Sequence, residues 1–138
     1  MAVVKADGYG HGAETVARAA LQGGATSLGV ASLQEGLELR RAGLEAPVLL
    51  LSNLNEPDDL RTCLHWRLMP TLSSLRDAQL CNALAADSGR CFDVQLKIDT
   101  GMARLGCSLS EGHQTSAELN SLEHLLSLIH ISEPTRPY

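Results

Sequence analysis

The sequence lacks the features of proteins that bind nucleic acid or membranes. It contains no cluster of lysine and arginine, and its formal net charge is -5, so the basic surface that polyanions require is absent. No apolar run approaches the roughly 20 residues that span a bilayer, and the first residues do not resemble a signal peptide. We therefore expect a cytoplasmic protein that handles a small molecule, with no nucleic-acid or membrane partner.

Cysteine is sparse, and its spacing does not fit the common metal or disulfide patterns. The four cysteines stand apart, with no C-x-x-C pair and no histidine at zinc-ligand spacing. We expect reduced thiols, mostly buried as small hydrophobic side chains, and no metal site. A zinc or disulfide role is the alternative.

Short apolar runs alternate with helical patterns along the chain. With 138 residues, 44% of them hydrophobic, the chain suits a single core. The apolar runs predict strands at residues 2–5, 28–32, 48–52, 68–72 and 92–99. Strand and helix recur about every 20 to 26 residues, which is the rhythm of right-handed βαβ units around a parallel sheet or barrel.

Capping residues mark the starts of several helices. Ser32 followed by Glu35 fits a capping box. Asn55 is the expected N-cap of the next helix, because a proline and two acids follow it closely. Ser74 opens another helix in a similar way, and the first helix is expected to start near Ala13.

The strand at residues 92–99 has one wholly apolar face and one wholly polar face. The polar residues are Asp93, Gln95, Lys97 and Asp99. A doubly wound sheet needs both faces apolar, whereas a barrel strand can turn a polar face inward. We therefore favour an α/β fold of the (β/α)8 TIM-barrel type. Because such a barrel takes about 250 residues, we expect only its first five or so βα units here.

Residues 126–138 are expected to be a non-native tail. The string LSLIHISEPTRPY fits no βα rhythm and ends in a segment with two prolines. It resembles a translated sequencing-library adapter fused where a gene read was cut short. We therefore place the barrel domain at residues 1–125. A genuine disordered terminus is the alternative.

Lys5 is the first candidate catalytic residue. It lies where the first predicted strand ends, and this end of the strands carries the active site in βα barrels. A neutral lysine amine suits imine formation, although a solvated strand terminus is the structural alternative. The three alternating glycines of residues 7–12 precede a helix and form a weak phosphate signature. A plain flexible turn fits them equally well.

Lys97, Asp99 and Arg104 form a second candidate cluster at the same end of the strands. Lys97 and Asp99 lie on the polar strand face, and Arg104 follows the strand. Burying any of these charges unpaired would cost several kcal/mol, so we expect mutual pairing or a ligand. A set of salt bridges that fills the barrel interior is the structural alternative.

Two segments together resemble the signature segments of the alanine racemases. They are residues 2–12 (AVVKADGYGHG) and 97–106 (KIDTGMARLG), which occur in the family's order and separation. Residues 28–36 and 47–51 are similar to the same family, so the resemblance covers most of residues 1–125. It implies a fold-type III barrel enzyme that uses pyridoxal 5'-phosphate to interconvert L-alanine and D-alanine, which supplies D-alanine for the bacterial cell wall.

The resemblance also implies roles for four residues. Lys5 would form the imine with pyridoxal phosphate and then act as acid and base on one face of the substrate α-carbon. Tyr9 would hydrogen-bond the cofactor phosphate. Arg104 would contact the cofactor's phenolic oxygen and help to place the substrate carboxylate. Lys97 would be carbamylated, which turns a cation that repels Arg104 into an anion that orients it.

Other features of the family are not found in this chain. Family members have a complete barrel followed by a β-rich domain, and they act as homodimers in which the partner supplies a tyrosine as the second base. The later phosphate loops and the arginine that faces the pyridine nitrogen are also missing. We therefore expect that this chain alone is not a competent racemase, although its full-length parent is one.

Three other interpretations remain open. The first is a racemase of the same fold that acts on another amino acid. The second is a non-catalytic barrel protein that binds pyridoxal phosphate, although such a protein would lack the segment at residues 100–104. The third is an unstable, non-enzymatic fragment, because an open barrel exposes two unpaired strand edges.

Overall fold

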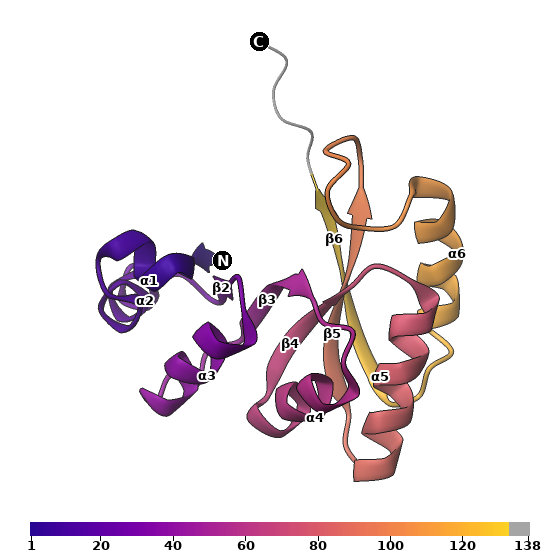
Figure 1. Ribbon diagram of the computed structural model, residues 1–138, viewed down its shortest axis with the longest axis horizontal. Coiled ribbons are helices and arrows are strands. Elements are labelled where there is room, and N and C mark those ends of the chain that lie inside the picture. Colours follow the sequence, from indigo (N-terminus) through magenta and orange to yellow (C-terminus); the bar gives the residue numbers. More distant parts are fainter. Residues whose placement is uncertain (133–138) are drawn as a thin grey trace.

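The computed structural model describes the backbone of residues 1–132 and the side chains of residues 1–126. Its strands are β1 (Ala2–Val3), β2 (Leu28–Val30), β3 (Val48–Asn53), β4 (Leu68–Leu72), β5 (Phe92–Asp99) and β6 (Leu125–Ser132). Its helices are α1 (Lys5–Gly10), α2 (Ala13–Gln22), α3 (Leu33–Arg41), α4 (Pro57–Trp66), α5 (Leu75–Ser88) and α6 (Leu109–Leu119). The strands form one parallel sheet in chain order, β1-β2-β3-β4-β5-β6 (Figure 1). The predicted succession of βα units is confirmed.

The hydrophobic core lies between the helices and one face of the sheet. Val48 and Leu50 of β3 are fully buried in it, as are Val94 and Leu96 of β5. Helices α2 to α6 all contribute side chains to the same cluster. A doubly wound sheet would need separate clusters on its two faces. The single cluster therefore supports the partial barrel.

Strand β5 keeps the two faces that its sequence predicts. Its four apolar side chains are buried in the core. On the other face, Asp93 is exposed, Gln95 and Asp99 are half-buried, and Lys97 is only 8% exposed. The Gln95 Oε1 atom is buried without a hydrogen-bond partner in the described part of the chain. The polar face thus combines a buried cation with an unpaired amide oxygen.

Strand β6 contradicts the expectation that residues after 125 lie outside the βα rhythm. It pairs with β5 in parallel at eight positions, from Phe92 with Leu125 to Asp99 with Ser132. This pairing uses the free edge of β5, which local sequence patterns do not reveal. The domain boundary at residue 125 and the origin of the tail in an adapter stay predictions. Residues 133–138 lie outside the described residues.

Two of the predicted helix caps are confirmed. Ser32 Oγ accepts a hydrogen bond from the Glu35 amide, and the Glu35 carboxylate accepts one from the Ser32 amide, which completes the capping box of α3. Ser74 Oγ accepts from the Asp77 amide at the start of α5. Helix α2 begins at Ala13, also as predicted. Local capping rules thus located the starts of α3 and α5.

The predicted N-cap at Asn55 is wrong. The N-cap of α4 is Glu56, and Pro57 is the first residue of the helix. Proline has the φ value of a helix and no amide hydrogen to satisfy, so it suits the first helical position. It also disfavours helical angles in the residue before it. Glu56 accordingly has an extended backbone, with φ of -87° and ψ of 128°.

All four cysteines are free thiols, as predicted. Cys63, Cys81 and Cys107 are buried, whereas Cys91 is exposed. Burial raises the pKa of Cys63 and of Cys81 to about 12, so both side chains act as neutral packing groups. Within the described residues, no cluster of histidine, cysteine and acidic side chains is suited to a metal ion. No helix described here has the length and apolar character needed to cross a membrane.

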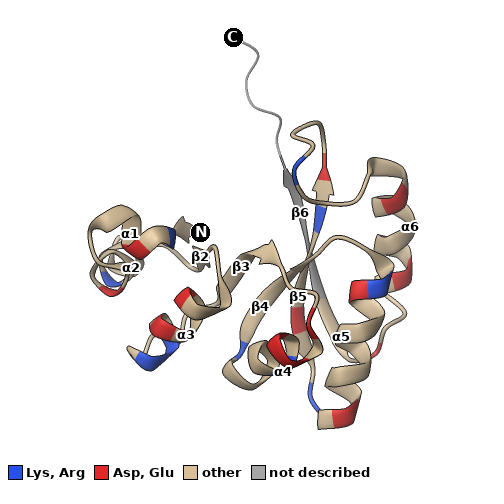
Figure 2. Cartoon of the chain, in the orientation of Figure 1, with Lys and Arg blue, Asp and Glu red and all other residues tan. Residues whose placement is uncertain are grey.

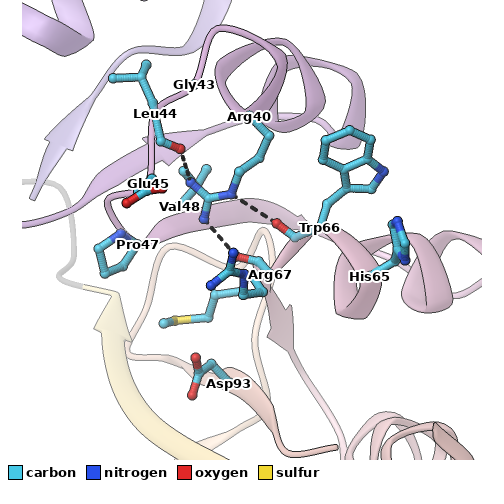
Figure 3. Close-up of a pocket in the computed structure, with 11 residues that line it drawn as sticks. Arg40, Gly43, Leu44, Glu45, Pro47, Val48, His65, Trp66, Arg67 and Asp93 are labelled. Carbon is cyan, nitrogen blue, oxygen red and sulfur yellow. Dashed lines mark hydrogen bonds between the residues drawn. The ribbon is translucent and has the colours of Figure 1, made fainter.

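Arg40 joins two loops at the amino-terminal edge of the sheet (Figure 3). Its guanidinium donates to the backbone carbonyls of Leu44, Ala46, Trp66 and Arg67, over distances from 2.7 to 2.9 Å. The last two carbonyls lie at the end of α4, where the helix dipole also favours a cation. Burial and then the nearby Arg67 lower the pKa of Arg40. The carbonyl contacts offset that cost and tie α3 to α4.

We expect Arg40→Lys to lower the free energy of unfolding by about 2 kcal/mol. The reason is that a lysine ammonium cannot reach the four carbonyls in the fixed geometry of a guanidinium. Arg41→Lys is the matched control, because Arg41 is the exposed next residue of the same helix, and it should change stability by less than about 0.5 kcal/mol. Urea unfolding followed by circular dichroism measures both. Equal losses would contradict the role of Arg40.

Candidate active site

Lys5 stands at the start of a left-handed turn that follows β1. The four residues after it, Ala6 to Tyr9, have φ values from 52° to 61° and ψ values from 37° to 52°. Left-handed helical angles cost about 1–2 kcal/mol for each ordinary L-residue. The predicted glycine loop is therefore a turn of defined shape that its surroundings must stabilise. Backbone strain of this kind is typical of functional sites.

Two carboxylates and one tight contact hold this turn. Glu35 Oε1 accepts a hydrogen bond from the Ala6 amide at 2.8 Å, and Asp7 Oδ1 accepts one from the Ala13 amide at 2.8 Å. Gly8 is buried, and a Cβ at its position would lie 2.9 Å from a valine methyl of α2. The positive φ favours glycine, but three neighbouring residues adopt the same angles without it, so the contact with α2 is what distinguishes Gly8.

Both predicted cofactor residues of this segment lie at the carboxyl end of β1. Lys5 is half-buried, and Tyr9 is 59% exposed, so its hydroxyl is accessible. Gly10 and Gly12 follow with positive φ values, and the space around the Gly10 α-carbon is open. The Gly12 amide donates to the Asp7 carbonyl and the Ala13 amide to the Asp7 carboxylate, so these amides at the start of α2 are satisfied within the turn. The segment therefore offers an amine and a phenol.

The second predicted cluster is also brought together, at the carboxyl end of β5. Burial and then the charge of Arg104 lower the pKa of Lys97. The Asp99 carboxylate accepts the Gly101 amide at 3.0 Å and the Ala103 amide at 3.1 Å, and these two bonds lower the pKa of Asp99. Among the described residues, no ion pair joins the three charged side chains. Asp99 therefore acts mainly on the loop backbone, and its charge offsets only part of the lowering of the Lys97 pKa.

Backbone pairing holds the loop that carries Arg104 against β5. The Cys107 amide donates to the Lys97 carbonyl at 3.0 Å, and the Asp99 amide donates to the Cys107 carbonyl at 2.8 Å. Gly106 lies at the closest approach, where φ is 119° and a Cβ would lie 2.8 Å from Asp99 N. Only glycine fits there. The sequence places this glycine in a signature segment but does not reveal the contact that requires it.

We expect Gly106→Ala to lower the free energy of unfolding by about 3 kcal/mol, because the new methyl group would press on backbone atoms. Gly43→Ala is the matched control. Gly43 also has a positive φ, of 78°, but no atom lies within 4 Å of its Cβ position. Gly43→Ala should lower the free energy of unfolding by only about 1 kcal/mol, from backbone strain alone. Thermal or urea unfolding compares them, and equal losses would refute the proposed clash.

The two clusters share one end of the sheet but lie on different strands. Figure 2 shows basic and acidic segments together near the upper end of β5. Lys5 follows β1, which is four strands away in the sheet. Neighbouring strands are about 4.8 Å apart, so the separation is roughly 19 Å along the sheet and shorter across its curve. Lys5 and Lys97 therefore lie at the same end of the strands, but on strands that are not neighbours.

The pocket in Figure 3 lies at the opposite edge of the sheet. Its lining includes Val48, Met69 and Asp93, which are the first or second residues of β3, β4 and β5. Active sites of parallel barrels form at the carboxyl ends of the strands. This pocket therefore lies at the amino-terminal end of the strands and not at the end expected for an active site. Its Arg40 already donates to backbone carbonyls there.

Comparison with known proteins identifies the family. The family model described as "Alanine racemase, N-terminal domain" matches residues 1–132. The chain belongs to the alanine racemase family. An alanine racemase of Prochlorococcus marinus is 59% identical over 125 residues, which are 91% of this chain and 32% of that protein. The resemblance seen in residues 2–12 and 97–106 is thereby confirmed.

Solved structures of racemases share the fold of the chain. An alanine racemase of Clostridium difficile 630, in complex with cycloserine, matches with a TM-score of 0.89 and 34% identity, over 97% of this chain and 37% of that one. A histidine racemase from Leuconostoc mesenteroides matches with a TM-score of 0.83 and 27% identity, over 96% of this chain and 37% of that one. The partial barrel fold is confirmed. The chain spans about a third of the length of these relatives.

Proposed function

We propose that the protein represented by this chain interconverts L-alanine and D-alanine, and that Lys5 is its cofactor lysine. The observation that carries the proposal is the place of Lys5, at the carboxyl end of β1 and at the start of a strained turn within the segment that matches the alanine racemases. Because the chain spans about a third of its relatives' length, the activity, the amino-acid substrate and a homodimeric assembly belong to this proposal.

The residues present fit pyridoxal 5'-phosphate. The half-buried Lys5 offers an amine for a C=N bond to the cofactor's aldehyde, and the accessible Tyr9 hydroxyl can donate to its phosphate. The exposed Arg104 guanidinium suits a phenolic oxygen or a substrate carboxylate. When bound, the cofactor supplies an electron sink for the substrate α-carbon, and Lys5 would move the proton on one face.

We expect pyridoxal phosphate followed by borohydride to label Lys5. The other primary amines of the chain are Lys97, its only other lysine, and the Met1 terminus. The label should be concentrated in the Lys5 peptide in the folded chain and spread over all three amines in urea. Peptide mass spectrometry measures the distribution, and Lys5→Ala should remove the dominant label. A folded wild-type chain without label at Lys5 would contradict the proposed function.

We further propose that Lys97 is carbamylated. Its side chain is 8% exposed, and its pKa is lowered by burial and by Arg104, so more of the amine is neutral than in an exposed lysine. The neutral nitrogen bonds to the carbon of carbon dioxide and releases one proton, which leaves a carboxylate on the nitrogen. This change would replace repulsion between Lys97 and Arg104 by attraction, and so orient Arg104.

We expect the intact chain in bicarbonate buffer to carry one adduct with the mass of carbon dioxide. Only the neutral amine reacts, so the adduct should increase as the pH rises through the lowered pKa of Lys97. Native mass spectrometry measures the fraction modified. Lys97→Gln should abolish the adduct, and Lys5→Ala should preserve it. Wild-type chain without an adduct across this pH range would refute the carbamylation.

We propose that the 138-residue chain does not racemise alanine by itself. In the described structure β1 pairs only with β2, and β6 pairs only with β5, so the sheet is open at both edges. An open sheet does not surround a substrate with groups on both faces.

The four free thiols fit the cytoplasm, where thiols stay reduced, and we include that location in the proposal.

Racemisation of another amino acid is the second candidate function. The observation that favours it is the match to the histidine racemase of Leuconostoc mesenteroides, which shares the fold over 96% of this chain. Lys5 would hold the cofactor in either case, because the proton transfer is the same. Comparing several amino acids as substrates of the full-length protein distinguishes the two candidates.

A further inference from the structure

The Glu35 carboxylate connects three segments of the backbone. Its Oε1 accepts the Ala6 amide at 2.8 Å, and its Oε2 accepts the Ala31 amide at 2.7 Å and the Ser32 amide at 3.2 Å. A capping box requires only the contact with the N-cap residue, here Ser32. The other two contacts are with Ala6, which follows Lys5, and with Ala31, which follows β2. Glu35 therefore does more than cap its own helix.

The contact with Ala6 bears directly on Lys5. Ala6 is the first residue of the left-handed turn, with φ and ψ both at 52°. Its amide belongs to the peptide plane that joins it to Lys5, so a hydrogen bond at this amide restrains the ψ angle of Lys5. Bonds from a backbone amide to a carboxylate are among the stronger ones in proteins. The restraint thus sets how the backbone turns at Lys5 and where its side chain starts.

We propose that Glu35 is a positioning residue for Lys5. The inference rests on the proposed role of Lys5 as the cofactor lysine. In the described structure the hydrogen bonds of the Glu35 carboxylate go to backbone amides, so it acts through the peptide plane and not on the reacting atoms. It stabilises a strained turn that would otherwise relax, and it thereby keeps the Lys5 amine aimed at the cofactor site.

Matched variants of the full 138-residue chain separate this role from helix capping. Glu35→Ala removes all three acceptor contacts, and Glu35→Gln keeps the size of the side chain but leaves one acceptor oxygen. Ser32→Ala removes the other half of the capping box, the bond from the Glu35 amide to Ser32 Oγ, and leaves the carboxylate in place. Glu38→Gln removes a charge from the exposed side of the same helix.

The first measurement needs no cofactor. Amide hydrogen exchange at Ala6, followed by nuclear magnetic resonance, should become about tenfold faster in Glu35→Ala, the factor expected for one lost hydrogen bond of ordinary strength. In Glu35→Gln the Ala6 amide should also exchange faster than in the wild type, but by a smaller factor. Ser32→Ala and Glu38→Gln should exchange like the wild type. Unchanged Ala6 exchange in both Glu35 variants overturns the proposal.

The second measurement is the rate at which pyridoxal phosphate and borohydride label Lys5, at a temperature where all variants are folded. The labelling rate should fall about tenfold in Glu35→Ala, because one hydrogen bond of ordinary strength aligns the amine. Ser32→Ala should be labelled at the wild-type rate. Equal slowing in Ser32→Ala would show that capping alone matters and would overturn the proposal. If Glu35→Ala does not fold, Glu35→Gln decides by the same criteria.

The two proposals fail in different ways. If the folded wild type is not labelled at Lys5, the proposed function is wrong, and Ala6 exchange still tests whether Glu35 holds the turn. If Lys5 is labelled equally well in the wild type and in both Glu35 variants, the cofactor lysine stands and the positioning role is refuted.

Discussion

The strands pair in parallel in strict chain order, so right-handed crossovers all bring their helices to the same face of the sheet. The hydrophobic core forms there, between the sheet and helices α2 to α6. The opposite face is left free for polar side chains, which is where Lys97 and Asp99 lie on β5. Because the strands run in one direction, their carboxyl ends meet at a single edge. Lys5 and Lys97 share that edge for this reason, although four strand spacings separate them.

Carboxylates in this protein fix loops more than they neutralise cations. Glu35 and Asp7 hold the turn after Lys5, and Asp99 holds the loop that carries Arg104. Each accepts backbone amides, which have fixed directions and therefore transmit orientation. Lys97 and Arg104 form no close ion pair among the described residues, and the Asp99 charge does not cancel the lowering of the Lys97 pKa by burial and by Arg104. This arrangement suits an anionic ligand or a carbamate.

Stability and chemistry are separated between the two edges of the sheet. At the amino-terminal edge, the Arg40 guanidinium donates to four carbonyls and ties α3 to α4. At the carboxyl edge, Ala6, Asp7 and Tyr9 adopt costly left-handed conformations after Lys5, although Arg67 at the other edge also has a positive φ. The family relationship and the place of Lys5 at the carboxyl edge both support the proposal that Lys5 anchors the cofactor.

The sequence by itself determined the features that depend on near neighbours. The two faces of β5, the Ser32 cap and the place of Lys5 at a strand end follow from alternation and capping, which operate within a few residues. Only the tertiary structure decided the contact of Glu35 with Ala6, 29 positions away, the bonds of Arg40 to the end of α4, and the pairing of β6 with β5. These contacts depend on which elements become neighbours when the sheet assembles, and no local pattern encodes that choice.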